Sequence, residues 1–291
     1  FDRAHIETIG SVFENNRADF NGAAISTFSE CTVALQDSLF RDNTSPHGGA
    51  ISISGRGGEI IGCVFEGNLA EGDGGALFYV GDNGDSIIFR DSRLVRNSAV
   101  NGGAAAVTGG AHLIFLNSAI SGNTATGGGG AVFLQDHQFT TSAPTVVFHA
   151  SSVLGNEAGG NGGALLSEDP GSSVKLVSSV LAFNVSYGEG GAVLLPEGAT
   201  PTIDASTVYG NRARHAGGVS APGASFAQFT SSIYWNNIDE GTDVRDANLF
   251  ADGLSGFSIV SHNSVQDDLA GDGSVYPGTA NTDQPPAIIP P

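Results

Sequence analysis

The sequence predicts a right-handed parallel β-helix of about nine to ten coils, with roughly 27 residues and three short strands in each coil. Three observations support this fold class. A Ser/Cys-x-apolar-x-x-Asn segment occurs nine times, a Gly-Gly-Ala-like segment follows eight of the nine, and no window shows the 3.6-residue apolar period of a helix. Such a period is typical of stacked coils of one supersecondary unit. Crossovers between parallel strands strongly prefer the right hand, so we expect that hand here.

The nine asparagines that end the first segment set the register of the repeat. Each follows a short β-prone stretch such as Cys63-Val64-Phe65. An Asn suits a tight left-handed bend because its side chain tolerates a positive φ, and stacked bends predict an asparagine ladder. The ladder residues are Asn16, Asn43, Asn68, Asn97, Asn123, Asn156, Asn184, Asn211 and Asn237, with successive gaps of 27, 25, 29, 26, 33, 28, 27 and 26 residues.

A glycine pair, such as Gly129-Gly130, marks the next bend of each coil. Glycine permits a positive φ and a close approach of neighbouring backbones, so the chain turns there before a second strand such as Ala131 to Leu134. A third strand, such as Ile87-Ile88-Phe89, follows a loop of variable length and precedes the next Ser segment. Each coil is therefore predicted to hold three strands.

Two motifs carry a resemblance to a known family. Gly-Gly-Ala-[Ile/Leu/Val] begins at Gly48, Gly74, Gly129, Gly162 and Gly190, and Phe-x-x-Asn begins at Phe13, Phe40 and Phe65. In this pairing the chain resembles the repeats of the polymorphic outer membrane proteins of chlamydiae, which occur more widely in secreted bacterial β-helix proteins. The resemblance covers roughly residues 10 to 240. It implies a β-helix in an extracellular, surface-exposed setting, where some members of the family are adhesive.

Composition limits the classes of partner. One Lys, ten Arg and 30 acidic residues give a formal net charge of −19, which argues against nucleic acid or an anionic membrane as a partner. No run of 18 apolar residues predicts a transmembrane helix. The chain has no Met and no signal-peptide pattern at its start, so we expect a secreted, trimmed product whose leader is absent.

The repeat register predicts one elongated domain, residues 1–266, and a Gly/Asp/Pro-rich tail, residues 267–291. The tail is either a linker or a docking strand, in which Ala287, Ile288 and Ile289 are buried on a neighbouring subunit. The two cysteines lie on consecutive coils. Cys63 occupies the Ser position of its repeat, whereas Cys31 lies seven residues before Ser38, and the pair forms either a disulfide or two buried thiols.

One apolar stripe is predicted to face outward. Strand side chains alternate between faces, so the residues two past each Ala of the glycine motif cannot share a face with their neighbours. On the middle coils these outward residues are Phe78, Phe133, Leu166 and Leu194. Either the excursion from Gln135 to Pro144 covers the stripe, or the stripe is an association surface.

The sequence holds no convincing catalytic constellation. Asn281-Thr282-Asp283 resembles a polygalacturonase motif by chance, and Arg90, Arg93 and Arg96 suit surface ion pairs. No cofactor is expected. Acidic turns offer weak candidate Ca²⁺ ligands, namely Asp82, Asp85, Asp267, Asp268 and Asp272, although none fits a known calcium loop.

These observations favour a non-enzymatic extracellular structural or adhesive β-helix. We expect self-association, head-to-tail or lateral, through open coil ends, the tail or the apolar stripe, because strand edges without a cap are templates for pairing. Two alternatives remain open. One is a monomeric adhesin passenger that binds a carbohydrate or a host cell surface, and the other is a carbohydrate-active β-helix enzyme, such as a polysaccharide lyase or hydrolase.

Overall fold

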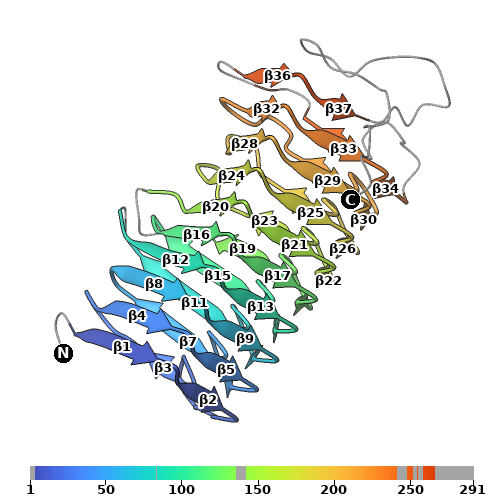
Figure 1. Ribbon diagram of the computed structural model, residues 1–291. Helices are drawn as coiled ribbons and strands as arrows, with labels where there is room; N and C mark the ends of the chain where they lie inside the picture. The colour runs from blue at the N-terminus through green and yellow to red at the C-terminus, as the bar shows by residue number, and fades with distance from the viewer. Residues whose placement is uncertain are drawn as a thin grey trace, which may run out of the picture.

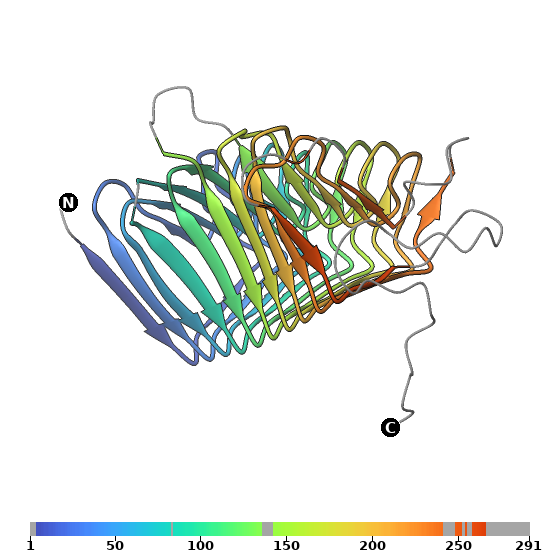
Figure 2. The same cartoon turned by 90° about the horizontal axis from the view of Figure 1, so that it is seen from above.

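The chain winds into an elongated stack of coils (Figures 1 and 2). The computed structural model describes residues 4–82, 84–135, 142–240, 248–251, 254 and 258–265. Every regular element among these residues is a β-strand, and all strand pairs are parallel. The strands form four sheets, which we name A, B, C and D in the order in which each coil passes through them. The parallel β-helix predicted from the repeat is therefore confirmed, with four strands per coil in place of three.

Sheet A supplies the longest strands, and its burial alternates along each strand. In β12, for example, Ile87 and Phe89 face the core while Ile88 faces outward. This alternation is the expected pattern for a sheet with one buried face. The strands of sheet A are β1 (His5–Ile9), β4 (Thr32–Gln36), β8 (Gly57–Ile61), β12 (Ser86–Arg90), β16 (His112–Leu116), β20 (Thr145–His149), β24 (Ser173–Val177), β28 (Thr200–Asp204), β32 (Gln228–Thr230) and β36 (Ile259–Ser261).

Sheet B holds the apolar residue of the Asn motif, whose side chain points into the core. Phe40 stacks between Phe13 and Phe65 with ring centroids 4.8 and 4.6 Å apart, so the aromatic column follows the spacing of the coils. The strands of sheet B are β2 (Val12–Glu14), β5 (Leu39–Arg41), β9 (Val64–Glu66), β13 (Arg93–Val95), β17 (Ala119–Ser121), β21 (Ser152–Leu154), β25 (Val180–Ala182), β29 (Thr207–Tyr209), β33 (Ile233–Trp235) and β37 (Ser264–Val265).

Sheet C is the sheet that the sequence analysis missed. Its strands hold two residues each and follow directly after the ladder asparagine, which makes them too short to show a period-two pattern. The strands of sheet C are β6 (Thr44–Ser45), β10 (Leu69–Ala70), β14 (Ser98–Ala99), β18 (Thr124–Ala125), β22 (Glu157–Ala158), β26 (Val185–Ser186), β30 (Arg212–Ala213) and β34 (Ile238–Asp239).

Sheet D follows the glycine motif, as predicted. Its side chains divide between the main core and an outer apolar cluster. The strands of sheet D are β3 (Ile25–Ser26), β7 (Ile51–Ser54), β11 (Leu77–Gly81), β15 (Ala105–Gly109), β19 (Val132–Gln135), β23 (Leu165–Ser167), β27 (Val193–Leu194), β31 (Val219–Ser220) and β35 (Leu249–Phe250).

Three sharp corners per coil use a left-handed residue, and none of them is a ladder asparagine. Between sheets B and C the positive φ falls on the residue before the asparagine, such as Asp42 before Asn43. The prediction that the asparagine itself takes the left-handed bend is therefore wrong, because its buried side chain serves hydrogen bonding instead. Between sheets A and B the left-handed residue precedes the Ser, and between C and D it is the first glycine of the pair.

The second glycine of the pair is required by close packing. A Cβ on Gly75 would overlap the carbonyl oxygen of Gly103 on the next coil, and the same overlap recurs along this corner. In the coil that contains Ala216, the alignment moves by one residue. Ala216 takes the left-handed position with a φ of 52°, so that Gly217 is the closely packed residue and Gly218 takes the place of the Ala.

Candidate functional site

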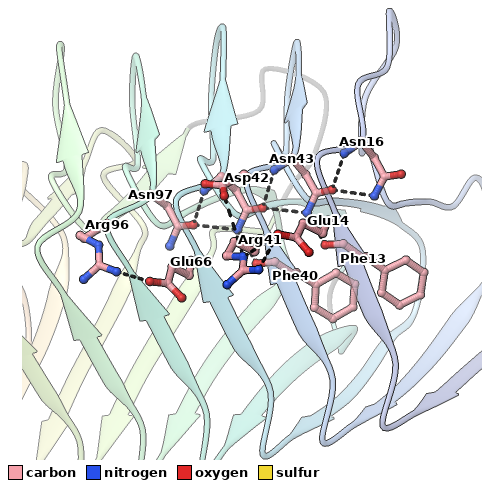
Figure 3. A network of polar contacts seen from close by, with 11 residues as sticks. Phe13, Glu14, Asn16, Phe40, Arg41, Asp42, Asn43, Glu66, Arg96 and Asn97 are labelled. Carbon is pink, nitrogen blue, oxygen red and sulfur yellow. Dashed lines mark hydrogen bonds and ion pairs between the residues drawn. The ribbon is translucent and has the colours of Figure 1, made fainter.

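The asparagine ladder joins successive coils through a repeated set of side-chain hydrogen bonds (Figure 3). At Asn123, Oδ1 accepts the backbone N–H of Asn97 at 2.9 Å and Nδ2 of Asn97 at 3.0 Å. Nδ2 of Asn123 in turn donates to Oδ1 of Asn156 at 2.9 Å and to the carbonyl of Leu94 at 3.0 Å. The buried amide thereby satisfies its polar atoms, as a low-dielectric interior demands. The bond from Nδ2 of one ladder asparagine to Oδ1 of the asparagine on the next coil recurs from Asn16 to Asn237.

A second ladder, which the sequence analysis did not predict, runs along the corner between sheets A and B. Ser118 donates its backbone N–H to Oγ of Ser151 at 3.1 Å, and its own Oγ donates to the carbonyls of Leu116 at 2.9 Å and Phe89 at 3.3 Å. The signal was present in the repeat, since the Ser of the motif is the residue that stacks. The ladder residues are Ser11, Ser38, Cys63, Ser92, Ser118, Ser151, Ser179, Ser206 and Ser232.

Two asparagines outside the repeat pattern continue the ladders at the C-terminal end. Asn237 donates its backbone N–H and its Nδ2 to Oδ1 of Asn248, at 3.2 and 2.9 Å, although only 11 residues separate the two. Ser232 donates its backbone N–H to Oδ1 of Asn263 at 3.0 Å. Spacing could not have identified Asn248, which lies only 11 residues after Asn237, whereas Asn263 lies 31 residues after Ser232, within the range of the repeat.

The first described coil presents the same bonding pattern at the outer edge of the stack. Asn16 is exposed and donates to Asn43, and its own Oδ1 receives no hydrogen bond from the described residues and points away from the ladder (Figure 3). The strands β1, β2 and β3 each form the edge of their sheet. Ile6, Phe13 and Ala24 are only partly buried against the core. This edge therefore offers backbone groups, an amide oxygen and apolar side chains in the register of an internal coil.

The outward stripe on sheet D forms a cluster separate from the main core. Ala106, Phe133 and Leu166 are buried in it, with Phe78 and Leu194 half-buried at its margins. Phe133 is only 2% exposed and Leu166 only 7%. As an association surface the stripe thus offers mainly Phe78 and Leu194. Residues 136–141 of the excursion between Gln135 and Pro144, proposed as the cover, lie outside the described residues.

Turns between sheets C and D contribute to the burial of this cluster. The ring of His47 lies 5.1 Å from the ring of Phe78. A Cβ on Gly128 would overlap the side chain of Leu166, so this glycine lies directly against the cluster. The chain therefore covers part of its own apolar stripe.

Several exposed arginines pair with glutamates on neighbouring coils. Arg41 pairs with Glu14, and Arg96 pairs with Glu66 (Figure 3). Arg90 approaches Glu59 at 3.9 Å, as the surface reading of the arginine cluster expects. Pairs at this level of exposure contribute little to stability. No ion pair is found for Arg93 among the described residues, although it belongs to the same arginine cluster.

Of the candidate calcium ligands, only Asp82 and Asp85 belong to the described residues. Asp82 and Asp85 close a turn, in which the backbone N–H of Asp82 donates to Oδ2 of Asp85 at 3.0 Å. Across the described part of the chain, no group of three His, Cys, Asp or Glu side chains is placed to hold a metal ion. Asp267, Asp268 and Asp272 lie outside the described residues, as do the tail residues Ala287, Ile288 and Ile289 and the motif Asn281 to Asp283.

Both cysteines are buried free thiols, so the Cys31–Cys63 disulfide is not formed. Cys63 occupies the serine ladder, where Ser38 donates its backbone N–H to the sulfur at 3.5 Å. Burial raises the pKa of the Cys63 thiol. Tyr79 is also wholly buried. Burial raises the pKa of its phenol, whose hydroxyl has no hydrogen-bond partner among the described residues.

Comparison with known families identifies the repeat. Residues 62–79 and 117–135 match the Chlamydia polymorphic membrane protein repeat, which confirms the resemblance seen in the motifs. Each segment begins at the corner before sheet B and ends in sheet D, so the matched unit is the part of the coil that carries the ladders and the glycine corner. A search of curated proteins found no match, and neither did a search of solved structures. No helix in the described ranges is long and apolar enough to cross a membrane.

Proposed function

We propose that this chain is a non-enzymatic structural segment of an extracellular surface protein, and that it self-associates through its first coil. The observation that supports the proposal is the edge of β1, β2 and β3, where the bonding pattern of an internal coil interface is repeated without a partner coil among the described residues. An unpaired strand edge is a template for another strand. The surface setting rests on the matched repeat, whose family is named for a membrane protein.

The proposed stacking contact involves several strand edges of the first coil at the same time. A docking coil would pair with three strand edges at once and would bury Phe13 and Ile6, which the present stack leaves half-buried. Asn16 would accept the amide of the incoming ladder, as Oδ1 of Asn43 accepts the amide of Asn16 at 2.8 Å. A contact of this head-to-tail kind does not close, so its products are filaments.

A single backbone change tests the edge. The carbonyl of Ala4 and the N–H of Gly10, on either side of β1, bond to β4. Backbone groups of successive residues face opposite sides of a strand, so the N–H of Glu7 points away from β4. Glu7→Pro removes that N–H and leaves the existing bonds of β1 intact. Glu7→Thr is the matched control, because it changes the side chain and keeps the N–H.

The assay is sedimentation velocity with electron microscopy over a range of protein concentrations. We expect filaments that are lost in Glu7→Pro and kept in Glu7→Thr. Filaments that survive Glu7→Pro but vanish when the chain is truncated before Pro285 would assign the contact to the tail instead. A single monomeric rod at every concentration would disprove self-association and leave a monomeric adhesin passenger as the better description.

A further inference from the structure

Three aromatic residues on consecutive coils lie at the corner where sheet B turns into sheet C. Tyr209 and Trp235 are partners in the register of β29 and β33, and Phe183 follows Ala182, the partner of Tyr209 on the preceding coil. The rings of Phe183 and Tyr209 meet edge to face, with centroids 5.5 Å apart. We call Phe183, Tyr209 and Trp235 the aromatic corner.

The aromatic corner is confined to one end of the rod. In the sheet B strands of three residues, the third residue lies on the opposite side of the strand from the central core residue, and on the first three coils it is Glu14, Arg41 or Glu66. On later coils the same column reads Val95, Ser121, an exposed Leu154 and a buried Ala182 before it reaches Tyr209 and Trp235. Val180 and Ile238 are exposed beside it, on sheets B and C. The repeat therefore holds the backbone constant while this column changes from charged to aromatic.

Phe183 takes a backbone conformation that a bulky side chain disfavours. Its φ is 57°, in the left-handed region. The equivalent residues are glycines on four coils, Gly67, Gly122, Gly155 and Gly210, and polar or charged residues on four others, Asn15, Asp42, Arg96 and Asn236. The core does not compensate for this strain, because the side chain is 58% exposed. Burial in the core therefore does not account for a phenylalanine at this bend.

The ring of Phe183 nevertheless has a fixed place. It lies over Gly210, where an added Cβ would come within 2.9 Å of Cε1 of the ring. With Tyr209 at its edge, the ring is held on two sides by the next coil. Rigid aromatic side chains offer contact area at a low cost in conformational entropy, so the corner is prepared for a ligand.

Charge narrows the choice of ligand. The chain carries a net charge of −19, which disfavours a nucleic acid, an anionic membrane or an acidic polysaccharide as the ligand of this corner. On the sheet C side of the corner, Arg212 pairs with Glu240, so the border supplies both hydrogen-bond donors and acceptors. An uncharged ligand with apolar faces and many hydroxyl groups suits both features.

We propose that the aromatic corner binds a neutral polysaccharide. The C–H faces of sugar rings stack on Phe183, Tyr209 and Trp235, and sugar hydroxyls bond to the Arg212–Glu240 pair. Successive rings lie one coil apart, about 4.8 Å along the rod, so a glycan chain aligned with the rod axis meets them in turn. This site is independent of the first-coil edge, which lies at the opposite end of the stack (Figure 1).

The experiment uses the only tryptophan of the chain as its probe. Trp235 fluorescence is recorded while the intact chain is titrated with cellohexaose, xylohexaose, chitohexaose and, as the anionic comparison, hexagalacturonate. We expect a saturable change in emission with at least one neutral oligosaccharide. A change with hexagalacturonate alone, or with none of the four sugars, would overturn the proposal.

Substitutions at the corner separate binding from folding. Phe183→Gly places at this bend the residue that four other coils use there, so the fold is retained while the ring is lost. We expect Phe183→Gly and Tyr209→Ala each to weaken binding roughly tenfold or more, as the loss of a central contact does. Phe28→Ala is the matched control, because Phe28 is 71% exposed on the first coils, and we expect no change.

Two further results would count against the proposal. Equal affinities for Phe183→Gly and the unmodified chain would show that the glycan binds elsewhere. An emission change that follows protein concentration in the absence of sugar, and that Phe183→Gly abolishes, would assign the corner to contact with a second copy.

Discussion

Replacing Asn123 by alanine tests whether the buried ladder holds the coils together. The change removes four side-chain hydrogen bonds in the middle of the stack. It leaves the backbone N–H of Asn97 and one Nδ2 hydrogen of Asn97 without a partner, in a site with no access to water. Oδ1 of Asn156 keeps the backbone N–H of Asn123, so the acceptor side is less affected.

The expected loss follows from those two buried donors. Each unsatisfied buried polar group costs about 1–3 kcal/mol, which gives about 2–6 kcal/mol for the pair. Asn16→Ala is the internal comparison. Asn16 is exposed and receives no bond at Oδ1, and Oδ1 of Asn43 keeps the backbone N–H of Asn16 at 3.1 Å, so we expect a loss of no more than about 1 kcal/mol.

Equilibrium urea unfolding followed by circular dichroism measures both variants. The reasoning is refuted if Asn123→Ala and Asn16→Ala lower the free energy of unfolding by the same amount. Asn123→Asp adds a check on the polarity of the ladder. The second oxygen of the aspartate would face two acceptors, the Leu94 carbonyl and Oδ1 of Asn156. Burial and the lack of a donor would both disfavour the charged form and so raise the pKa of the new carboxyl. The variant should then lose stability as pH rises above about 4, the ordinary value for Asp.

Three further predictions concern the corners and the core. Gly75→Ala should prevent the coils from packing, because its Cβ would overlap the Gly103 carbonyl. At Gly155 an added Cβ has open space, so Gly155→Ala should lose only about 1 kcal/mol of stability. Thermal unfolding of the two variants compares these losses. Tyr79→Phe should gain about 1 kcal/mol in urea unfolding, because it removes a buried hydroxyl that lacks a partner, and a loss would reveal a partner. Burial raises the pKa of the Cys63 thiol above its ordinary 9.0, so stability should fall as pH rises through that value, and Cys63→Ser should flatten this fall.

The sequence predicted those parts of the fold that every coil repeats. Nine Asn motifs and their glycine pairs fix the register, and strands such as β9 and β19 fall where the motifs place them. The strength of this prediction comes from repetition, because one Phe-x-x-Asn segment alone would be a weak signal. The repeated motifs also lie within the segments that match the family repeat, residues 62–79 and 117–135.

The parts that were missed depend on backbone geometry that residue types do not encode. A two-residue strand such as β10 has no period to detect, and it exists because the corner before Asn68 turns the chain against its neighbours. The left-handed residue was placed on the asparagine because Asn tolerates that conformation. The structure uses the residue before it, Gly67 in this coil, and uses the asparagine side chain for four hydrogen bonds.

Repetition also determines where function should be sought in this molecule. A residue type that recurs on every coil, such as the ladder asparagine, is accounted for by coil-to-coil bonds and carries no further information. A column that changes along the rod is different, because the backbone is the same at each step and packing alone does not require the change. The sheet B column passes from Glu14, Arg41 and Glu66 to Tyr209 and Trp235 over one nearly constant backbone. Comparing columns in this way separates the residues that build the rod from those free to bind a ligand, and it selects the aromatic corner.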